Sequence, residues 1–288
     1  MELLHRDSHA ARISKWNKAK LHGKEQYARH DEINRDFVLH APEYGVFGVA
    51  DGHGPRRLGI LAARAASMTF AHAMAKRGAR PMSSVDVQDR LYTEGVLDEM
   101  QESVLRVARR AGPHADVRTT FTGVVLTPDS KGTIFHIGDG VATLRIPDVL
   151  TDPDDGFNDR ILAQTTAQVE GSNQLTNFLG LRYGEVSDDF GLATQPGVTK
   201  CEMKRAEVIP FTLRPESGLI VATNGVYAGY HNEQMLDSDF HRITSRNNEV
   251  PEVVDRLIKD GRKVDDASAV FIRFSRQLSA SARRVIIT

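Results

Sequence analysis

Apolar residues return every three or four positions in two segments of the first half of the chain, residues 55–78 and residues 84–110. The first segment carries Leu58, Leu61, Ala62, Ala65 and Met68, and the second carries Leu97, Met100, Val104 and Val107. This is the period of one face of an α-helix. Gly112 and Pro113 end the second pattern, because neither residue favours the continuation of a helix. The sequence therefore predicts two long amphipathic helices in succession.

From residue 121 the pattern changes to short apolar runs separated by turn residues. The runs FTGVVL (121–126), TIFHI (133–137) and VATLRI (141–146) follow one another closely. Their connections are too short for a crossover between parallel strands, so we expect the three runs to pair as an antiparallel meander. At least eight strands are expected, since five further runs have strand character: FVLH (37–40), VFGVA (46–50), EVIPF (207–211), LIVAT (219–223) and AVFIRF (269–274).

Residues 148–200 are polar and irregular, and we interpret them as a flap or insertion. A helix is predicted near residues 171–179. The acidic stretch at 152–159 lacks the ligand spacing and the closing Glu of a calcium-binding EF-hand, which favours a solvated turn. The chain is expected to form one domain over residues 1–288, with its core at about 24–274 and short basic extensions at both ends.

Composition is that of a globular protein. Of 288 residues, 40% are hydrophobic and 26% are charged, which is enough apolar material for a continuous core. Lys and Arg number 37 against 38 Asp and Glu, so no overall field favours nucleic acid or a membrane surface. The single cysteine, Cys201, excludes an internal disulfide and fits a reducing compartment. We expect a cytoplasmic protein, since no signal-peptide pattern or long apolar run is present. We also expect a monomer.

Three predicted strands run directly into a small polar residue followed by glycine: VFGVADG, IFHIGDG and LIVATNG. Each dipeptide alone is typical of a turn. Strands that end side by side, however, would bring Asp51, Asp139 and Asn224 to one rim of a sheet. Asp265 precedes the last predicted strand and would join them. Such oxygen ligands are those that Mg²⁺ and Mn²⁺ prefer.

The sequence ADGHG at residues 50–54 places a carboxylate, a glycine carbonyl and a histidine in succession. With the motifs around it, this sequence resembles the metal-dependent Ser/Thr protein phosphatases of the type 2C, or PPM, class over residues 24–274. The matching motifs are Asn34-Arg35-Asp36, Asp51-Gly52-His53-Gly54, His136-Ile137-Gly138-Asp139, Leu175-Thr176 with Leu179-Gly180, Thr223-Asn224-Gly225 and Asp265-Asp266-Ala267-Ser268. The resemblance implies an α+β fold, an α-β-β-α sandwich of two antiparallel β-sheets flanked by helices.

The resemblance also implies a centre of two Mn²⁺ or Mg²⁺ ions. By position, Asp51 would bridge both ions, and Gly52 would offer its carbonyl oxygen to one of them. Asn224 and Asp265 would complete the ligands. Asp139 matches a ligand of an accessory third ion, but we do not expect a third ion to bind.

The implied reaction is hydrolysis of a phosphoserine or phosphothreonine in a protein substrate. Two divalent cations about 3.5 to 4 Å apart acidify a shared water and neutralise the phosphoryl oxygens. Asp36 would orient that water, and His53 would protonate the departing alkoxide as a general acid. Such an enzyme would act on phosphoproteins opposite a Ser/Thr kinase in signalling.

Three positions depart from the pattern of this family. Asn224 stands where the family has a metal-binding Asp, so the site keeps an oxygen donor but loses one negative charge. Ala228 replaces a second Asp of the same loop. Asp31 occupies the place of a phosphate-binding Arg, whose role Arg29 or Arg35 could take over.

These departures leave alternatives open. The first hypothesis is an active protein phosphatase whose activity is reduced by Asn224 and Asp31. The second is a pseudophosphatase that binds phosphoproteins as a regulatory module. A small-molecule phosphoesterase on the same scaffold is a third. Asn224 itself fits either an engineered substitution or a natural tolerance for Mn²⁺.

Overall fold

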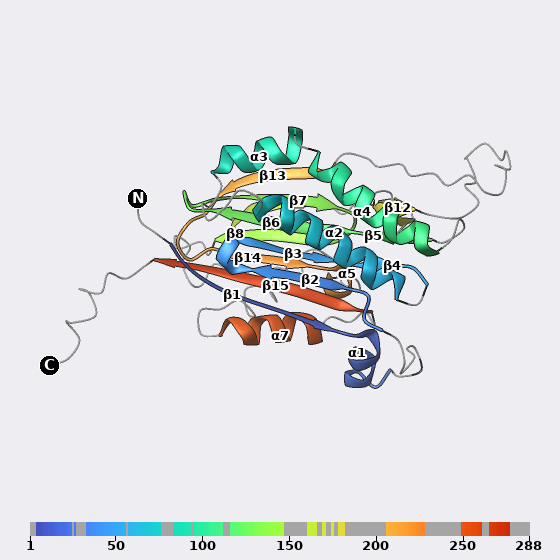
Figure 1. The fold of residues 1–288 in the computed structure, drawn as a ribbon. Coiled ribbons are helices and arrows are strands. Elements are labelled where there is room, and N and C mark those ends of the chain that lie inside the picture. The colour runs from blue at the N-terminus through green and yellow to red at the C-terminus, as the bar shows by residue number, and fades with distance from the viewer. Residues whose placement is uncertain are drawn as a thin grey trace.

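The computed structural model describes residues 4–24, 26, 33–55, 57–75, 83–93, 95–111, 116–146, 160–165, 169–170, 174–175, 178–181, 206–227, 249–260 and 265–276. Within these residues, two antiparallel five-stranded sheets lie face to face, and helices cover the outer face of each (Figure 1). The α-β-β-α sandwich implied by the resemblance is confirmed.

The first large sheet has the strand order β13-β7-β6-β3-β2. Its strands are β2 (Phe37–Ala41), β3 (Val46–Ala50), β6 (Phe121–Thr127), β7 (Lys131–Ile137) and β13 (Glu207–Thr212). The short 3-10 turn Pro42–Tyr44 joins β2 to β3 and ends at Gly45, whose φ of +67° favours glycine. A side chain at Gly45 would also collide with the carbonyl of Leu126, so the turn packs tightly on β6.

The second large sheet has the strand order β1-β15-β14-β8-β9. Its strands are β1 (Leu4–Ile13), β8 (Val141–Ile146), β9 (Arg160–Gln164), β14 (Gly218–Ala222) and β15 (Ala267–Arg276). Two smaller sheets accompany it in the described residues. They contain β4 (Gly52–His53), β5 (Val117–Thr119) and β12 (Leu179–Leu181) in one, and β10 (Val169–Glu170) and β11 (Gln174–Leu175) in the other.

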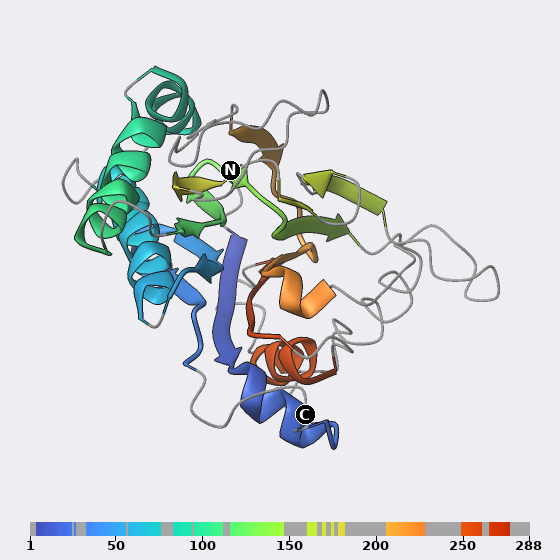
Figure 2. The ribbon, with the colours of Figure 1, turned by 90° about the vertical axis from the view of Figure 1, so that its right-hand side faces the viewer.

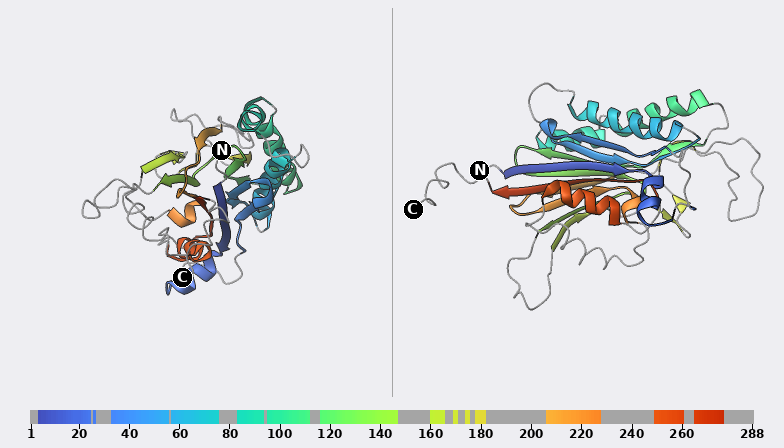
Figure 3. Two further views of the ribbon diagram at one scale, coloured as in Figure 1. Left: turned by 90° about the vertical axis from the view of Figure 1, so that its left-hand side faces the viewer. Right: turned by 90° about the horizontal axis from the view of Figure 1, so that it is seen from below.

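Helices form the two outer layers, as the rotated views show (Figures 2 and 3). The first sheet is covered by α2 (Leu58–Ala75), α3 (Ser84–Thr93) and α4 (Val96–Ala111). The second sheet is covered by α7 (Val250–Asp260), with α1 (Lys15–Leu21) and the short α5 (Asn224–Tyr227) at one end. By length and composition α2 could cross a membrane, but its buried face packs on the first sheet as in a core helix.

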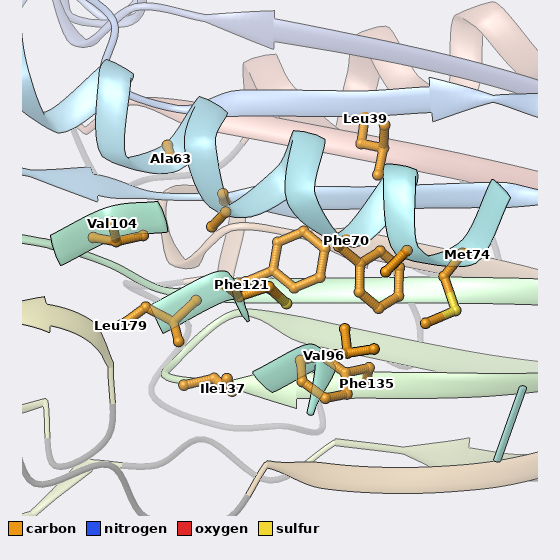
Figure 4. Close-up of a cluster of buried hydrophobic side chains, with 14 of the residues drawn as sticks. Leu39, Ala63, Phe70, Met74, Val96, Val104, Phe121, Phe135, Ile137 and Leu179 are labelled. Atoms are coloured by element: carbon orange, nitrogen blue, oxygen red, sulfur yellow. The ribbon is translucent and has the colours of Figure 1, made fainter. Parts of the chain in front are cut away.

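Three apolar clusters of described residues hold these layers together. Between the helices and the first sheet, the ring of Phe70 lies 4.8 Å from that of Phe121 and 5.5 Å from that of Phe135 (Figure 4). The second cluster joins the inner faces of the two sheets, and the third joins α7 to the second sheet. Burial of each large apolar side chain contributes about 1.5 to 3 kcal/mol, so the sandwich is a stable platform for the loops at its ends.

The predicted strands are all present, but two predictions about their surroundings are wrong. The segment 84–110 forms two helices, because the chain turns at Gly95 with a φ of +70°, which a helix does not accommodate. The predicted meander is not one hairpin series either. In the structure β7 pairs with β6 and β13, while β8 pairs with β14 and β9 in the other sheet. The link between them therefore crosses the sandwich, and Gly138 makes this possible with a φ of +110°.

The N-terminal end and the flap also differ from expectation, and the predicted C-terminal extension after residue 276 lies outside the described residues. The basic N-terminal stretch is no extension: β1 pairs with β15 from Leu4 to Ile13, and α1 follows it. The helix predicted near residues 171–179 is wrong, since its described residues form β11 and the start of β12. The acidic stretch at 152–159 lies outside the described residues.

Candidate active site

The polar residues that follow the strands gather at one end of the sandwich. Asp51 directly follows β3 of the first sheet, and Asp139 lies in the link from β7 to β8. Asn224 follows β14, and Asp265 comes just before β15. Asp36 precedes β2. The structure thus brings together residues from both sheets, as expected from strands that end side by side.

The pKa of Asp51 shows that several carboxylates lie close to one another. Its pKa is raised well above the ordinary value, first by burial and then by repulsion from Asp36, Asp265 and Asp139. The positive charge of Arg35 opposes this shift. The backbone of Asp51 is fixed where β5 meets β6, since its carbonyl accepts hydrogen bonds at 2.7 Å and 3.0 Å, from the hydroxyl of Thr119 and the N–H of Thr120. Four carboxylates therefore share one small region.

Asp36 is fully buried beside this group. Its Oδ2 accepts a hydrogen bond from the hydroxyl of Thr223 at 2.9 Å, and its backbone N–H donates to Oδ1 of Asn34 at 2.9 Å. Burial, followed by repulsion from Asp266, raises the pKa of Asp36 to about 7, although Ser268 and Thr223 act in the opposite direction. Asp36 can therefore hold or release a proton near neutral pH.

Asn224 and Asp139 contact each other directly. Nδ2 of Asn224 donates to Oδ2 of Asp139 at 2.6 Å. Oδ1 of Asn224 is buried and has no hydrogen-bond partner in the part of the chain that the structure describes. The amide nitrogen of Asn224 thus hydrogen-bonds to Asp139, and the amide oxygen is available to bind a ligand.

Asp265 and Asp266 form the turn before β15. Oδ1 of Asp265 accepts the backbone N–H of Asp266 at 3.0 Å. Asp266 is buried, and its two oxygens accept the backbone N–H groups of Lys15 at 2.7 Å and Arg35 at 2.9 Å. Burial raises the pKa of Asp266, against the effect of these bonds. Asp266 therefore ties neighbouring segments together, while Asp265 remains the ligand candidate.

Gly52 lies buried in β4, against the start of α2. A side chain at Gly52 would collide with the carbonyl of Gly59, and one at Gly59 would press on the carbonyl of Gly52. The two glycines are therefore needed for α2 to begin this close to Asp51. The suggested role of the Gly52 carbonyl as a metal ligand remains a prediction.

His53 projects from β4 with about half of its side chain exposed, 52%. Its Nε2 lies 3.4 Å from Oδ2 of Asp116, whose Oδ1 lies 3.5 Å from Nε of Arg118. The guanidinium of Arg118 also lies over the ring of Phe178 at 5.4 Å. The motifs that suggested His53 gave no sign of Asp116, because that contact depends on the pairing of β4 with β5.

Arg35 is the described candidate for binding phosphate. Its side chain is 27% exposed, and its Nε lies 3.9 Å from Oδ2 of Asp266. Its effect on the pKa of Asp51 places its charge beside the carboxylate group. Arg29, Asp31 and Ala228 lie outside the described residues.

The donor chemistry of this site fits hard divalent cations, although the ligands are not fully gathered. No group of three or more His, Cys, Asp or Glu among the described residues already has the arrangement of a metal site. The buried Oδ1 of Asn224 is nonetheless an oxygen donor without a hydrogen bond to any described residue. The carboxylates around Asp51 repel one another, and a cation between them would relieve that repulsion.

Several bacterial Ser/Thr phosphatases of known structure share this fold. PppA, a regulatory component of the type VI secretion system of Pseudomonas aeruginosa, is 14% identical, with a TM-score of 0.59 over 95% of this chain and 100% of PppA. The catalytic domain of PstP from Mycobacterium tuberculosis, in complex with two manganese ions, is 16% identical, with a TM-score of 0.56 over 96% and 100% of the two chains. MsPP from Mycobacterium smegmatis is 19% identical, with a TM-score of 0.55 over 94% and 99%.

At these identities the structural similarity establishes a common fold. A direct sequence comparison with curated proteins finds no match. The sequence profile described as Protein phosphatase 2C matches residues 22–259, which is well over half of the chain and includes the site from Asp36 to Asn224. The chain therefore belongs to the protein phosphatase 2C family.

Proposed function

We propose that this protein hydrolyses phosphoserine and phosphothreonine in protein substrates. The observation that carries the proposal is the meeting of Asp51, Asp139, Asn224 and Asp265 at one end of the sandwich, with the partly exposed His53 two residues after Asp51 in the chain. Family membership supports the same reaction class. The regulatory role of PppA supports a phosphoprotein substrate, and we propose a Ser/Thr kinase as the counterpart. We place the protein in the cytoplasm as a monomer.

Two Mn²⁺ or Mg²⁺ ions would be held by Asp51, the Gly52 carbonyl, Asp265 and Oδ1 of Asn224. When bound, such ions acidify water and neutralise phosphoryl oxygens. The complex of PstP with two manganese ions supports this choice of metal. Asp139 is engaged by the Asn224 amide, which supports two ions rather than three.

Side chains of the protein would orient the water, protonate the leaving group and bind the phosphate. Asp36, buried and with a pKa of about 7, would accept a hydrogen bond from the attacking water and orient it. Water attacks phosphorus, and the bond from phosphorus to the Ser or Thr oxygen breaks. Nε2 of His53 would give its proton to that oxygen, since an alkoxide is too basic to leave unprotonated. Oδ2 of Asp116 lies 3.4 Å from the same nitrogen. Arg35 would bind the phosphate.

The test is release of phosphate from a phosphothreonine peptide with Mn²⁺ varied from micromolar to millimolar concentration. We expect turnover by the unmodified protein and loss of turnover in Asp51→Ala. Asp98→Ala, an exposed carboxylate on α4, serves as the matched control and should leave turnover unchanged. Phosphate release that is equal with Mn²⁺ and with EDTA, or that survives Asp51→Ala, would contradict the proposal.

A second candidate function is favoured by the contact between Asn224 and Asp139. Asn224 puts a neutral amide where a carboxylate would attract cations, and that amide is already hydrogen-bonded to Asp139. A pseudophosphatase that binds phosphoproteins without hydrolysis would fit this arrangement. Binding of the phosphothreonine peptide in EDTA, without turnover in Mn²⁺ by either the unmodified protein or Asn224→Asp, would select this function.

A further inference from the structure

The junction of β1 and α1 contacts three segments of the site. Nη1 of Arg12 donates to the carbonyl of Asp36 at 2.8 Å. The backbone N–H of Lys15 donates to Oδ1 of Asp266 at 2.7 Å, and Nζ of Lys18 donates to the carbonyl of Gly225 at 2.7 Å. The three donors are spaced three residues apart along the chain. The segments of the site that come from distant parts of the sequence thus meet on this junction.

Lys18 is the unusual member of this set, because its side chain is fully buried. An ammonium group removed from water is costly unless its hydrogen bonds are well made. Lys20 on the same helix is exposed, as lysines ordinarily are. The helix itself is fixed at its start by Ser14, whose hydroxyl accepts the N–H of Asn17 at 3.3 Å. The Lys18 ammonium thus reaches Gly225 from a helix whose first turn is capped by Ser14.

Gly225 also lies against the turn before β15. A Cβ atom at this position would collide with the carbonyl of Asp266, so the peptide after Asn224 lies directly against that turn. Lys18 contacts the same residue through the Gly225 carbonyl. Asn224 is therefore followed directly by a residue that contacts both Lys18 and the turn at Asp266.

We propose that Lys18 is a positioning residue for Asn224. Its buried ammonium fixes Gly225 through the carbonyl of that residue, and the fixed Gly225 positions the neighbouring Asn224, so that Nδ2 reaches Asp139 and Oδ1 is left available for a divalent cation. The cation part of this inference rests on the proposed function. The orientation of the Asn224 amide does not, because it is a property of the protein without metal.

The experiment compares Lys18→Met with the unmodified protein, and with Lys20→Met as the matched control on the same helix. The first measurement is the nitrogen-15 NMR signal of the Asn224 side-chain amide in metal-free protein, identified by its absence in Asn224→Ser. The second is the dissociation constant of Mn²⁺ by calorimetry. In Lys18→Met we expect the chemical shift of the Asn224 amide to differ from that in the unmodified protein, because the hydrogen bond to Asp139 is lost. We expect the dissociation constant of Mn²⁺ to rise about ten- to a hundredfold. Lys20→Met should match the unmodified protein in both.

A folded Lys18→Met protein with an unchanged Asn224 signal would overturn the proposal. If Lys18→Met does not fold, Lys18→Gln takes its place under the same criteria, because its shorter neutral side chain keeps polarity but does not reach Gly225. If the unmodified protein releases no phosphate or binds no Mn²⁺, the proposed function fails, and the amide signal alone still decides the role of Lys18.

Discussion

The side chain of Asn224 donates a 2.6 Å hydrogen bond to Asp139, and this bond joins the end of β14 to the link between β7 and β8. The amide has two opposite effects on the proposed metal site. It stabilises the site without metal, because it donates a hydrogen bond to the carboxylate of Asp139. It also lowers the attraction for cations, because it contributes no negative charge.

Asn224→Asp should therefore destabilise the metal-free protein and strengthen Mn²⁺ binding. Two carboxylates would face each other in place of the present hydrogen bond, so we expect a lower melting temperature in EDTA. Mn²⁺ should raise the melting temperature of the variant by more than it raises that of the unmodified protein. Thermal melts with and without Mn²⁺ check both effects. Asn17→Asp, at an exposed position, changes net charge equally and should show no enhanced Mn²⁺ response.

His53→Ala should lower turnover of a phosphothreonine peptide by about 10²- to 10⁴-fold. The loss should be much smaller with p-nitrophenyl phosphate, since nitrophenolate leaves without being protonated. The measurement is kcat for both substrates at saturating Mn²⁺. Equal losses on the two substrates would show that His53 acts in some way other than proton donation. His72→Ala, on the exposed face of α2, provides the control.

The metal-free protein should be more stable at pH 5 than at pH 8. The pKa of Asp36 is about 7 in the folded state against an ordinary value of 3.8, so the folded protein binds a proton that the unfolded chain releases between these values. Stability is therefore greatest at the low end of this window and is lost as pH rises towards 7. The raised pKa of Asp51 acts in the same direction. Urea unfolding in EDTA across this range measures the slope, and Asp36→Asn should flatten it.

Phe70→Ala should lower the free energy of unfolding by about 3 to 5 kcal/mol, because the ring is fully buried between Phe121 and Phe135. Urea titration provides the measurement. Met68→Ala, on the same helix but 49% exposed, should change stability by no more than about 0.5 kcal/mol. A similar loss in both variants would mean that α2 does not pack as described.

Much of the fold could be predicted because local patterns decide it. The eight apolar runs form strands since each is bounded by turn residues, and the site gathers where those strands end. β1 escaped prediction because it is an edge strand: the sequence HRDSHAAR reads as polar, and only pairing with β15 makes it a strand. The crossing from β7 to β8 escaped as well, since a short Gly-Asp-Gly link fits a hairpin equally well.

The residues of the site that belong to sequence motifs could be predicted. The residues that reach the site through contacts between distant segments could not. Asp51, Asp139 and Asn224 follow predicted strands and Asp265 precedes one, so the strand pattern points to all four residues. Asp116 reaches His53 only through the pairing of β4 with β5, and Lys18 looks like one more basic residue near the start of the chain. Burial distinguishes Lys18 from its neighbours, and no local pattern reports burial of a charged group.

Lys15 and Asp266 are joined by a hydrogen bond although 251 positions separate them in the sequence. On the ribosome, β1 and α1 emerge long before the turn at Asp266 and the strand β15 exist. The contacts of Lys15 and Lys18 with the site can form only after those last segments have been synthesised. A nascent chain therefore carries Asp51, Asp139 and Asn224 before the contacts that assemble the proposed site can form, and the proposed phosphatase activity should appear only once translation has passed β15.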